Sequence, residues 1–503
     1  MFRHPTMGQL RACAEDLGMA PSEEYLEATK RIVGPLVEAY QALDSIPDNL
    51  PEVKYPRTPG YRPEPTENLH NAWYVKTSIK GARRGKLVGN RVAIKDNICV
   101  AGVQMMNGAS VLEGYIPEVD ATVVTRILDA GGEIAGKAVC EYYCVSGTSS
   151  TSSTGPVHNP HRRGYSAGGS SSGSAALVAA GEVDFALGGD QAGSIRIPSS
   201  YCGVYGMKGT FGLVPYTGAA SLETTIDHCG PITNNVKNNA LLLEVIAGSD
   251  GLDSRQSNVK TARYTKALEE AITGLRIGVV AEGFGQENSQ PDVDAKVRNA
   301  AERMARLGAE VVDISIPMHR LTREIWIPIG HDGGFRTMLA THGAGGNHEG
   351  LYLPSLIDAA SGWQNRSDEF ADTMKIIALF SHYSLKHYRG HYYAKAMNLR
   401  RKLREAYDTA LKDVDLLLMP TLPMKASKLP GPDATPEATT AVAWEMLANT
   451  CGVNLTGHPA MSLPCGIEDD RPIGLMLIGR HWEEATIYRA AHSFEQAGDW
   501  KYF

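Results

Sequence analysis

The most constraining feature of the sequence is the run from Gly164 to Lys208, GYSAGGSSSGSAALVAAGEVDFALGGDQAGSIRIPSSYCGVYGMK. Two loops rich in glycine and serine flank a stretch of small apolar residues, 175–180, which predicts a fully buried helix. A buried strand at 185–187 and a tight turn up to Ser194 are predicted next. The run therefore predicts two loops held rigidly on a core, one presenting Ser170 and the other Ser194.

The turn that ends at Ser194 suits a nucleophilic serine. Tight turns leave successive backbone N–H groups unpaired and convergent, which is what a negatively charged reaction intermediate needs. The predicted donors of this oxyanion hole are the N–H groups of Gln191, Ala192, Gly193 and Ser194. A serine hydroxyl also needs a base. The run holds no histidine, so the base has to come from elsewhere in the chain.

Lys95 is the candidate base. It directly follows residues 92–94, a short apolar run typical of a buried strand, and lysine is rarely interior without a partner. Taken alone, the position also permits a lysine whose side chain reaches solvent from the strand end. Ser170 is the candidate group for linking Lys95 to Ser194.

Several other chemistries lack their motifs. The chain has no G-x-x-x-x-G-K-[ST], no strand-linked G-x-G-x-x-G, no H-E-x-x-H and no G-x-S-x-G around Ser194. His387 and His391 lie four positions apart on a predicted helix, but no third ligand follows, so we predict no metal site. Cys202 is interpreted as a buried structural thiol.

The remaining sequence predicts an α/β fold. Residues 120–137 predict a helix capped by Asp120 and then a strand, and residues 274–314 predict strand, helix and strand. Later strands are predicted at 415–419, 460–464 and 475–478, the last two as edge or late strands. The serine-rich residues 146–155 are interpreted as an ordered loop near the active centre.

Four segments are predicted: an N-terminal helical cap and linker (1–75), the first part of the core (76–319), a helical and loop insertion over the pocket (320–400) and the second part of the core (401–503). Helices in the first segment begin at a capping box, Thr6 to Gln9, and after Ser22. The second helix carries an apolar stripe that either packs on the core or forms part of a dimer contact: Tyr25, Ala28, Ile32, Leu36 and Tyr40.

Charge, apolar stretches and cysteine content limit which partners and which compartment we expect. The 503 residues carry a formal net charge of −7, which argues against a nucleic-acid partner, since such proteins usually carry a basic stripe. No apolar stretch of about 18 residues occurs, so we predict no membrane span, and the first residues lack the apolar core of a signal peptide. Eight cysteines are too few for a disulfide scaffold, so we predict reduced thiols in a cytoplasm.

The run Gly168–Lys208 resembles the defining motif of the amidase signature family. That family's pattern is a GGSSGGS-like loop, an apolar stretch, G(T)D-x-GGSIR-x-P and G-x-x-G-x-KPT; this chain has GGSSSGS, GGDQAGSIRIP and GVYGMKGT. The VAIKDN motif around Lys95 matches as well. Further matching blocks lie at 415–421, 457–460 and 472–475, so the resemblance covers about residues 70–495.

The resemblance implies a large mixed β-sheet with helices on both sides and a Ser-Ser-Lys triad without a cofactor. In this triad Ser194 attacks the amide carbonyl, forming an acyl-enzyme. Ser170, held by a cis peptide bond, relays the proton. Lys95 is the final base and then the acid for the departing ammonia. The N-terminal helices and the middle insertion look most like bacterial amidases of nitrile metabolism, and we expect a homodimer.

Corresponding positions in similar amidases imply an acyl pocket at Val145, Ser146, Ile226 and Trp326. These walls are mainly apolar and suit a mid-sized aliphatic or aromatic amide as the small-molecule partner. Two other functions stay open. One is the amide-cleaving component of a tRNA-dependent amidotransferase, which would need partner subunits and nucleic acid. The other is a weakly active relative that binds amides.

Three positions depart from the family pattern. Ala192 stands where glycine is usual, Gly189 replaces a frequent threonine and Gly209 replaces a proline. Alanine at 192 adds strain if its φ is positive and is harmless if its φ is negative. Gly189 removes a hydroxyl near the site, and Gly209 should loosen its turn. Asp190 and Arg196 are expected to form a pair that braces the loop.

Overall fold

The chain folds into two compact units. The computed structural model describes residues 2–345 and 348–503. The units are Met1–Glu52 and Val53–Phe503, and the second contains every predicted site residue. The four-segment division of the sequence stays a prediction; its boundary between residues 400 and 401 falls inside helix α12 (His391–Asp413).

The first unit consists of three short helices: α1 Met7–Asp16, α2 Glu23–Ile32 and α3 Gly34–Leu43. The predicted capping box is confirmed, since Thr6 accepts from the Gln9 amide while the Gln9 side chain accepts from the Thr6 amide. Ser22 caps α2 as predicted. The predicted second helix is interrupted at Val33, so its apolar stripe is divided between α2 and α3. The large side chains of that stripe are exposed.

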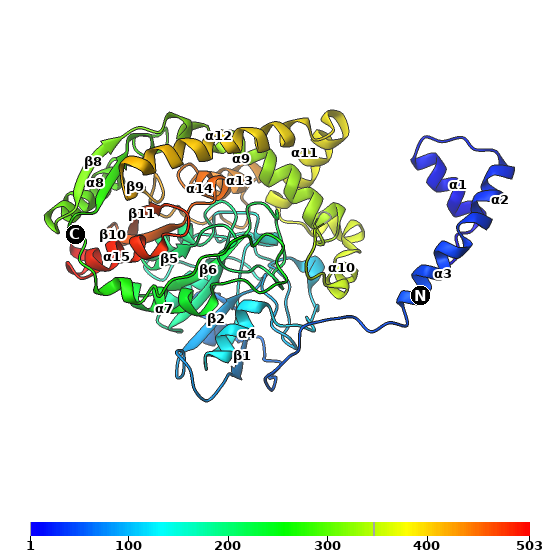
Figure 1. Ribbon diagram of the computed structural model, residues 1–503, viewed down its shortest axis with the longest axis horizontal. Coiled ribbons are helices and arrows are strands. Elements are labelled where there is room, and N and C mark those ends of the chain that lie inside the picture. Colours follow the sequence, from blue (N-terminus) through cyan, green and yellow to red (C-terminus); the bar gives the residue numbers. More distant parts are fainter. Residues whose placement is uncertain (1, 346–347) are drawn as a thin grey trace. The chain divides into compact units, whose positions relative to one another are not determined.

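Within the described residues, eleven strands form one mixed sheet at the centre of the second unit (Figure 1). The strand order is β1-β3-β2-β4-β6-β5-β10-β11-β9-β7-β8. The predicted α/β class is therefore confirmed. The strands are β1 Trp73–Lys80, β2 Arg91–Lys95, β3 Glu133–Ala138, β4 Phe185–Asp190, β5 Tyr205–Lys208, β6 His228–Thr233, β7 Arg276–Val280, β8 Glu310–Ile314, β9 Leu416–Pro420, β10 Ala460–Glu468 and β11 Arg471–Gly479.

Helices cover both faces of the sheet. Helices α4, α7, α15 and α8 pack side by side against it, whereas the buried helices α5 and α6 pack against each other and against the strands that carry the Gly164–Lys208 run. The remaining helices of this unit are α4 Thr122–Asp129, α5 Ser172–Ala179, α6 Arg196–Cys202, α7 Val236–Ile246, α8 Pro291–Arg306, α9 Thr322–Pro328, α10 Pro354–Ala360, α11 Asp372–Tyr388, α13 Pro436–Trp444, α14 Cys451–Thr456 and α15 Glu484–Glu495.

Strands β10 and β11 lie in the interior of the sheet, so the prediction that they are edge strands is wrong. They form a long antiparallel hairpin between β5 and β9, and the ends of the sheet are β1 and β8. The hairpin turns at Asp469 and Asp470, both with positive φ, as a two-residue hairpin turn requires. Both strands are buried almost throughout, which fits strands covered on both faces.

Two local predictions are also corrected. Asp120 does not cap α4; its carboxylate pairs with Arg57 and accepts from the Ala101 amide instead. His387 and His391 do not share a helix, because α11 ends at Tyr388 and the chain turns before α12 begins. The predicted helix–strand unit at 120–137 and the strand–helix–strand unit at 274–314 are confirmed.

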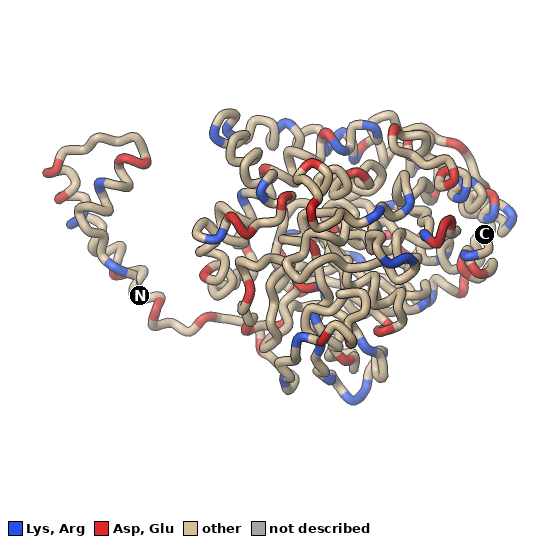
Figure 2. The backbone as a smooth tube through the Cα atoms, turned by 180° about the vertical axis from the view of Figure 1, so that it is seen from behind, with Lys and Arg blue, Asp and Glu red and all other residues tan. Residues whose placement is uncertain are grey.

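Charges of both signs are interspersed along the backbone on the side drawn in Figure 2. Among the described residues, no helix combines the length and the apolar character that crossing a membrane needs.

Candidate active site

Lys95 ends strand β2 and is completely buried. Its Nζ donates to Ser170 Oγ at 2.8 Å and to the Gly189 carbonyl at 3.3 Å. The alternative of a solvent-facing lysine is therefore excluded, and two of the predicted site residues are in direct contact.

Ser170 is reached through a cis peptide bond between Gly169 and Ser170, as the resemblance implied. Its carbonyl accepts from the Glu141 amide at 3.2 Å. Gly169 has no room for a side chain, because a Cβ would lie 1.9 Å from the Thr148 carbonyl oxygen. The loop that carries Ser170 is therefore packed tightly against residues 141–148.

The serine-rich residues 146–155 form an ordered loop, as predicted. The buried carboxylate of Glu141 organises it through one oxygen, Oε2, which accepts from the Thr151 hydroxyl at 2.9 Å and from the Ser150 and Thr151 amides at 3.2 Å. Burial raises the pKa of Glu141 despite these hydrogen bonds. One acidic side chain thus holds the loop beside Ser170.

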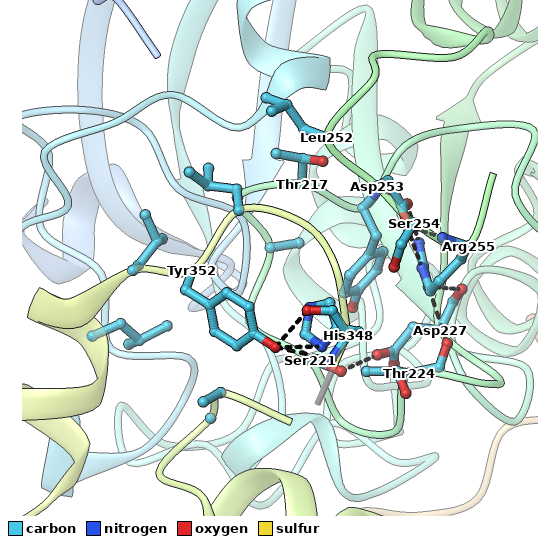
Figure 3. A pocket seen from close by; sticks show the side chains of 18 of the residues that line it. Thr217, Ser221, Thr224, Asp227, Leu252, Asp253, Ser254, Arg255, His348 and Tyr352 are labelled. Atoms are coloured by element: carbon cyan, nitrogen blue, oxygen red, sulfur yellow. Dashed lines mark hydrogen bonds and ion pairs between the residues drawn. The ribbon is translucent and has the colours of Figure 1, made fainter. Parts of the chain in front are cut away.

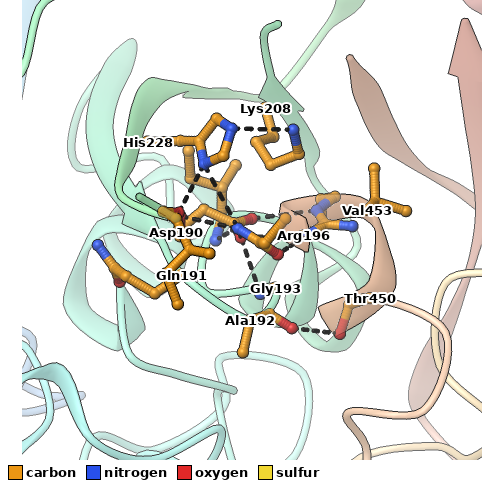
Figure 4. Close-up of polar contacts among 12 residues, drawn as sticks. Asp190, Gln191, Ala192, Gly193, Arg196, Lys208, His228, Thr450 and Val453 are labelled. Atoms are coloured by element: carbon orange, nitrogen blue, oxygen red, sulfur yellow. Dashed lines mark hydrogen bonds and ion pairs between the residues drawn. The ribbon is translucent and has the colours of Figure 1, made fainter. Parts of the chain in front are cut away.

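Asp190, the last residue of β4, organises the turn that carries Ser194 (Figure 4). Its two carboxylate oxygens accept from the Gly193 amide at 2.8 Å, from the Ile195 amide at 3.1 Å and from the Arg196 guanidinium at 3.0 Å. The predicted Asp190–Arg196 pair is confirmed and fully buried. Burial alone would raise the pKa of Asp190, but the Arg196 charge outweighs it and holds the pKa well below its usual value.

Three of the four predicted oxyanion donors remain available. Among the described residues, the backbone amides of Gln191, Ala192 and Ser194 donate to no other group, whereas the Gly193 amide is engaged by Asp190. Ser194 itself is 5% exposed and faces the small pocket described below. The turn thus presents a hydroxyl and free amides to one space.

The backbone at Ala192 is not strained, because its φ is not positive. The residue that needs to be glycine is Gly193, with φ of 133° and Thr450 Oγ1 only 2.5 Å from where a Cβ would stand. Thr450 lies just before α14 and donates its hydroxyl hydrogen to the Ala192 carbonyl at 2.5 Å (Figure 4). Nothing in the sequence pattern pointed to Thr450.

Lys208 and His228 belong to a polar cluster beside the turn that carries Ser194 (Figure 4). The Lys208 ammonium group has three acceptors: the His458 carbonyl at 2.6 Å, the Gly209 carbonyl at 3.2 Å and His228 Nε2 at 3.3 Å. Burial lowers the pKa of both Lys208 and His228. Asn454 connects α14 to the turn by donating to the Asp190 carboxylate at 2.8 Å.

The pocket at Ser194 is small and mainly apolar. Val145, Ser146 and Trp326 line it, whereas Ile226 is buried and is not among its lining residues. That the three bind the substrate stays a prediction. The pocket's free volume is about 20 Å³, little more than one water molecule needs. Lining residues that sequence reasoning missed come from five separate segments: Cys144, Leu222, Gly330, Ile377, Trp444 and Leu447.

A second cavity, shown in Figure 3, is larger, with a free volume of about 140 Å³. Its wall is polar at Asp227, Asp253 and Arg255, with Arg255 paired to Asp253 at 2.6 Å. The two spaces are adjacent, because Gln191 lines the small pocket and donates through Nε2 to the hydroxyl of Tyr216, which lines the larger cavity.

Of the other positions that depart from the family pattern, Gly189 has room for a side chain. A Cβ there would lie 3.5 Å from Lys95 Nζ and 3.6 Å from the Tyr216 hydroxyl, which is ordinary contact. The predicted loosening at Gly209 stays a prediction.

The amidase family model matches residues 63–488 of the chain. The chain is 46% identical to an enantioselective amidase of Rhodococcus rhodochrous over 442 residues, which cover 86% of this chain and 84% of that protein. It is 37% identical to a glutamyl-tRNA(Gln) amidotransferase subunit of Methanosarcina mazei, covering 85% of this chain and 88% of the relative. The crystal structure of the corresponding glutamyl-tRNA(Gln) amidotransferase subunit of Thermotoga maritima superposes with a TM-score of 0.71 at 29% identity, covering 85% of this chain and 88% of that one.

Proposed function

Because the chain belongs to the amidase signature family, we propose that this amide-hydrolysing enzyme converts a carboxylic acid amide to the acid and ammonia through Ser194, Ser170 and Lys95. The observation that carries the proposal is the contact between Lys95 Nζ and Ser170 Oγ at 2.8 Å, fully buried beside the turn of Ser194. A lysine placed there has a hydroxyl as its nearest partner and can exchange protons with it.

In the first half-reaction Ser194 Oγ attacks the amide carbonyl carbon. Its proton passes through Ser170 to neutral Lys95, and the carbonyl oxygen takes the negative charge. The free amides of Gln191, Ala192 and Ser194 stabilise that oxyanion. The same proton then returns through Ser170 to the nitrogen, the C–N bond breaks, and ammonia leaves an ester on Ser194.

In the second half-reaction water takes the place of ammonia. Lys95 and Ser170 accept a proton from the water as it attacks the ester carbon. The C–O bond to Ser194 then breaks, the proton returns to Ser194 Oγ, and the carboxylic acid leaves. Each catalytic group ends in its starting protonation state.

The lining of the small pocket supports an apolar acyl group, either aliphatic or aromatic. Large apolar side chains that line it are Leu222, Trp326, Trp444 and Leu447. Since the free volume of about 20 Å³ is smaller than any such group, substrate binding has to displace lining side chains. This requirement favours mid-sized over very bulky amides.

The resemblance to amidotransferase subunits supports a second candidate, an ammonia-supplying subunit that uses glutamine. One experiment distinguishes the two functions. The purified chain is incubated with propionamide, benzamide or a mixture of glutamine and ATP, and released ammonia is measured. Ammonia from the simple amides without ATP supports the hydrolase. Release only from the mixture of glutamine and ATP would replace it by the amidotransferase function, and no release from any of them favours a silent amide-binding relative.

We also propose that the chain acts as a homodimer in a cytoplasm, without a nucleic-acid partner. The exposed apolar side chains of α2 and α3 support self-association, and the eight free cysteines support a reducing compartment. Light scattering after size-exclusion chromatography measures the mass in solution. A monomer at micromolar concentration would contradict the dimer.

A further inference from the structure

Three side chains with metal-binding atoms meet outside the pocket: Asp408, His458 and His481. Asp408 lies on α12, His458 just before β10 and His481 just after β11. His458 Nε2 is 3.0 Å from Asp408 Oδ1, and His481 Nδ1 is 3.7 Å from the same oxygen. We propose that these residues form a binding site for a first-row divalent cation, with Zn²⁺ as the best fit.

The hydrogen bond that His481 makes through Nε2 leaves a lone pair on its Nδ1, and this atom faces the Asp408 carboxylate. Its Nε2 is 3.2 Å from the Thr456 carbonyl oxygen, which can only accept, so Nε2 carries the hydrogen. In the neutral ring Nδ1 is then unprotonated and points toward Asp408 Oδ1, another acceptor. Two acceptors 3.7 Å apart repel each other unless a proton or a cation lies between them.

The spacing of the three atoms suits a cation rather than a single proton. Zn²⁺ binds histidine nitrogen and carboxylate oxygen at about 2.0–2.2 Å, so tetrahedral ligand atoms lie about 3.3 Å apart. The two separations from Asp408, 3.0 and 3.7 Å, bracket this value, and all three atoms lie within 4.8 Å of one another. Coordination requires small side-chain rotations and the hydrogen of neutral His458 on Nδ1, so that its Nε2 can bind the cation instead of donating to Asp408.

The surroundings also match a metal site. The Thr456 carbonyl that orients His481 is the kind of outer partner that metal-ligating histidines usually have. His458 is completely buried, whereas the Asp408 side chain is 47% exposed, which leaves a path from solvent to the site. The guanidinium of Arg404, which also donates to the Thr456 carbonyl, adds a positive charge nearby that weakens cation binding.

The test uses the full chain without an affinity tag, stripped of metal by a chelator and dialysed. Calorimetric titration with zinc chloride is expected to show one strong site per chain. Asp408→Asn and His481→Ala should each weaken that site at least about tenfold, because even outer-partner losses cost about 10- to 100-fold. The exposed pair His387→Ala and His391→Ala is the matched control and should leave the strong site unchanged.

Diffraction from Zn²⁺-soaked crystals of the unmodified chain keeps the test valid if a variant folds poorly. An anomalous peak within coordination distance of Asp408 Oδ1, His458 Nε2 and His481 Nδ1 supports the site. A strong site that persists in both variants, or a peak at other histidines only, would overturn it. Failure to bind Zn²⁺ at all would overturn it too.

Discussion

Lys95 Nζ and Ser170 Oγ are 2.8 Å apart, although 75 positions separate them in the chain. The contact arises because β2 ends where the cis-linked loop of Ser170 approaches the carboxyl end of β4. It fits the order of proton transfer in the proposed reaction, in which Ser170 passes the proton between Ser194 and Lys95. Both that order and the backbone that supports it can be tested by substitution.

Ser194→Ala should abolish turnover and preserve the fold, because it removes only the attacking oxygen from a site where alanine fits. The measurement is ammonia release from the best amide found in the screen, with circular dichroism as the check on folding. A residual rate above about a hundredth of the unmodified chain would rule out Ser194 as the nucleophile.

Lys95→Ala should lose activity at every pH, because it removes the amine that donates to Ser170 Oγ. The rate is measured from pH 6 to about pH 10, the upper end being where an ordinary lysine loses its proton. Recovery of the rate toward high pH would show that hydroxide or another residue can serve as the base.

Ala192→Gly and Gly193→Ala should behave very differently although they exchange the same two residue types. Ala192 has no positive φ, so glycine there should leave the rate within about threefold. At Gly193 a Cβ would collide with Thr450 and lie at a φ that disfavours side chains, costing about 1–3 kcal/mol of stability and most of the activity. Equal losses in the two variants would show that this φ assignment is wrong.

Thr450→Val should lower kcat more than it changes KM, because it removes the hydroxyl that holds the Ala192 carbonyl and so the direction of the oxyanion amides. An unsatisfied carbonyl costs about 1–3 kcal/mol, which corresponds to a loss of about 5- to 150-fold. Thr450→Ser keeps the hydroxyl and should retain most of the rate. If serine and valine are equally impaired, the methyl group and not the hydrogen bond is responsible.

Asp227→Asn should change how stability depends on pH. Burial raises the pKa of Asp227 to about 6 in the folded chain, above its unfolded value of 3.8. The folded state therefore gains stability from the protonated carboxyl at low pH and loses it as the pH rises through about 6. Relative to the asparagine variant, the unmodified chain should lose up to about 3 kcal/mol between pH 4 and 7, measured by urea unfolding. A pH-independent difference would contradict this.

The two serine loops and the brace between Asp190 and Arg196 could be predicted because all their residues lie within one run of sequence. Thr450 and Asn454 could not, since they reach the same turn from a helix more than two hundred positions later. The missed pocket residues have the same cause: Trp444 and Ile377 look like ordinary helix residues until the fold places them together.

The place of β10 and β11 in the sheet was predictable in part. Both strands read as nearly continuous apolar runs, a pattern typical of strands buried on both faces, so the sequence does contain a signal against an edge position. The neighbours of the hairpin, β5 and β9, could not be inferred, because strand order follows from the packing of the whole sheet. The hydrogen bond from the Gly193 amide to the Asp190 carboxylate could likewise be found only in the structure.

The central hairpin also determines when the protein can finish folding during synthesis. Residues 460–479 join the half of the sheet that ends at β5 to the half that begins at β9. The two halves therefore cannot form one sheet until this segment has been synthesised. Until the ribosome has released that segment, β5 and β9 each present an unpaired edge to the cell. Ribosome-bound chains that stop before residue 460 are therefore the species most in need of a chaperone.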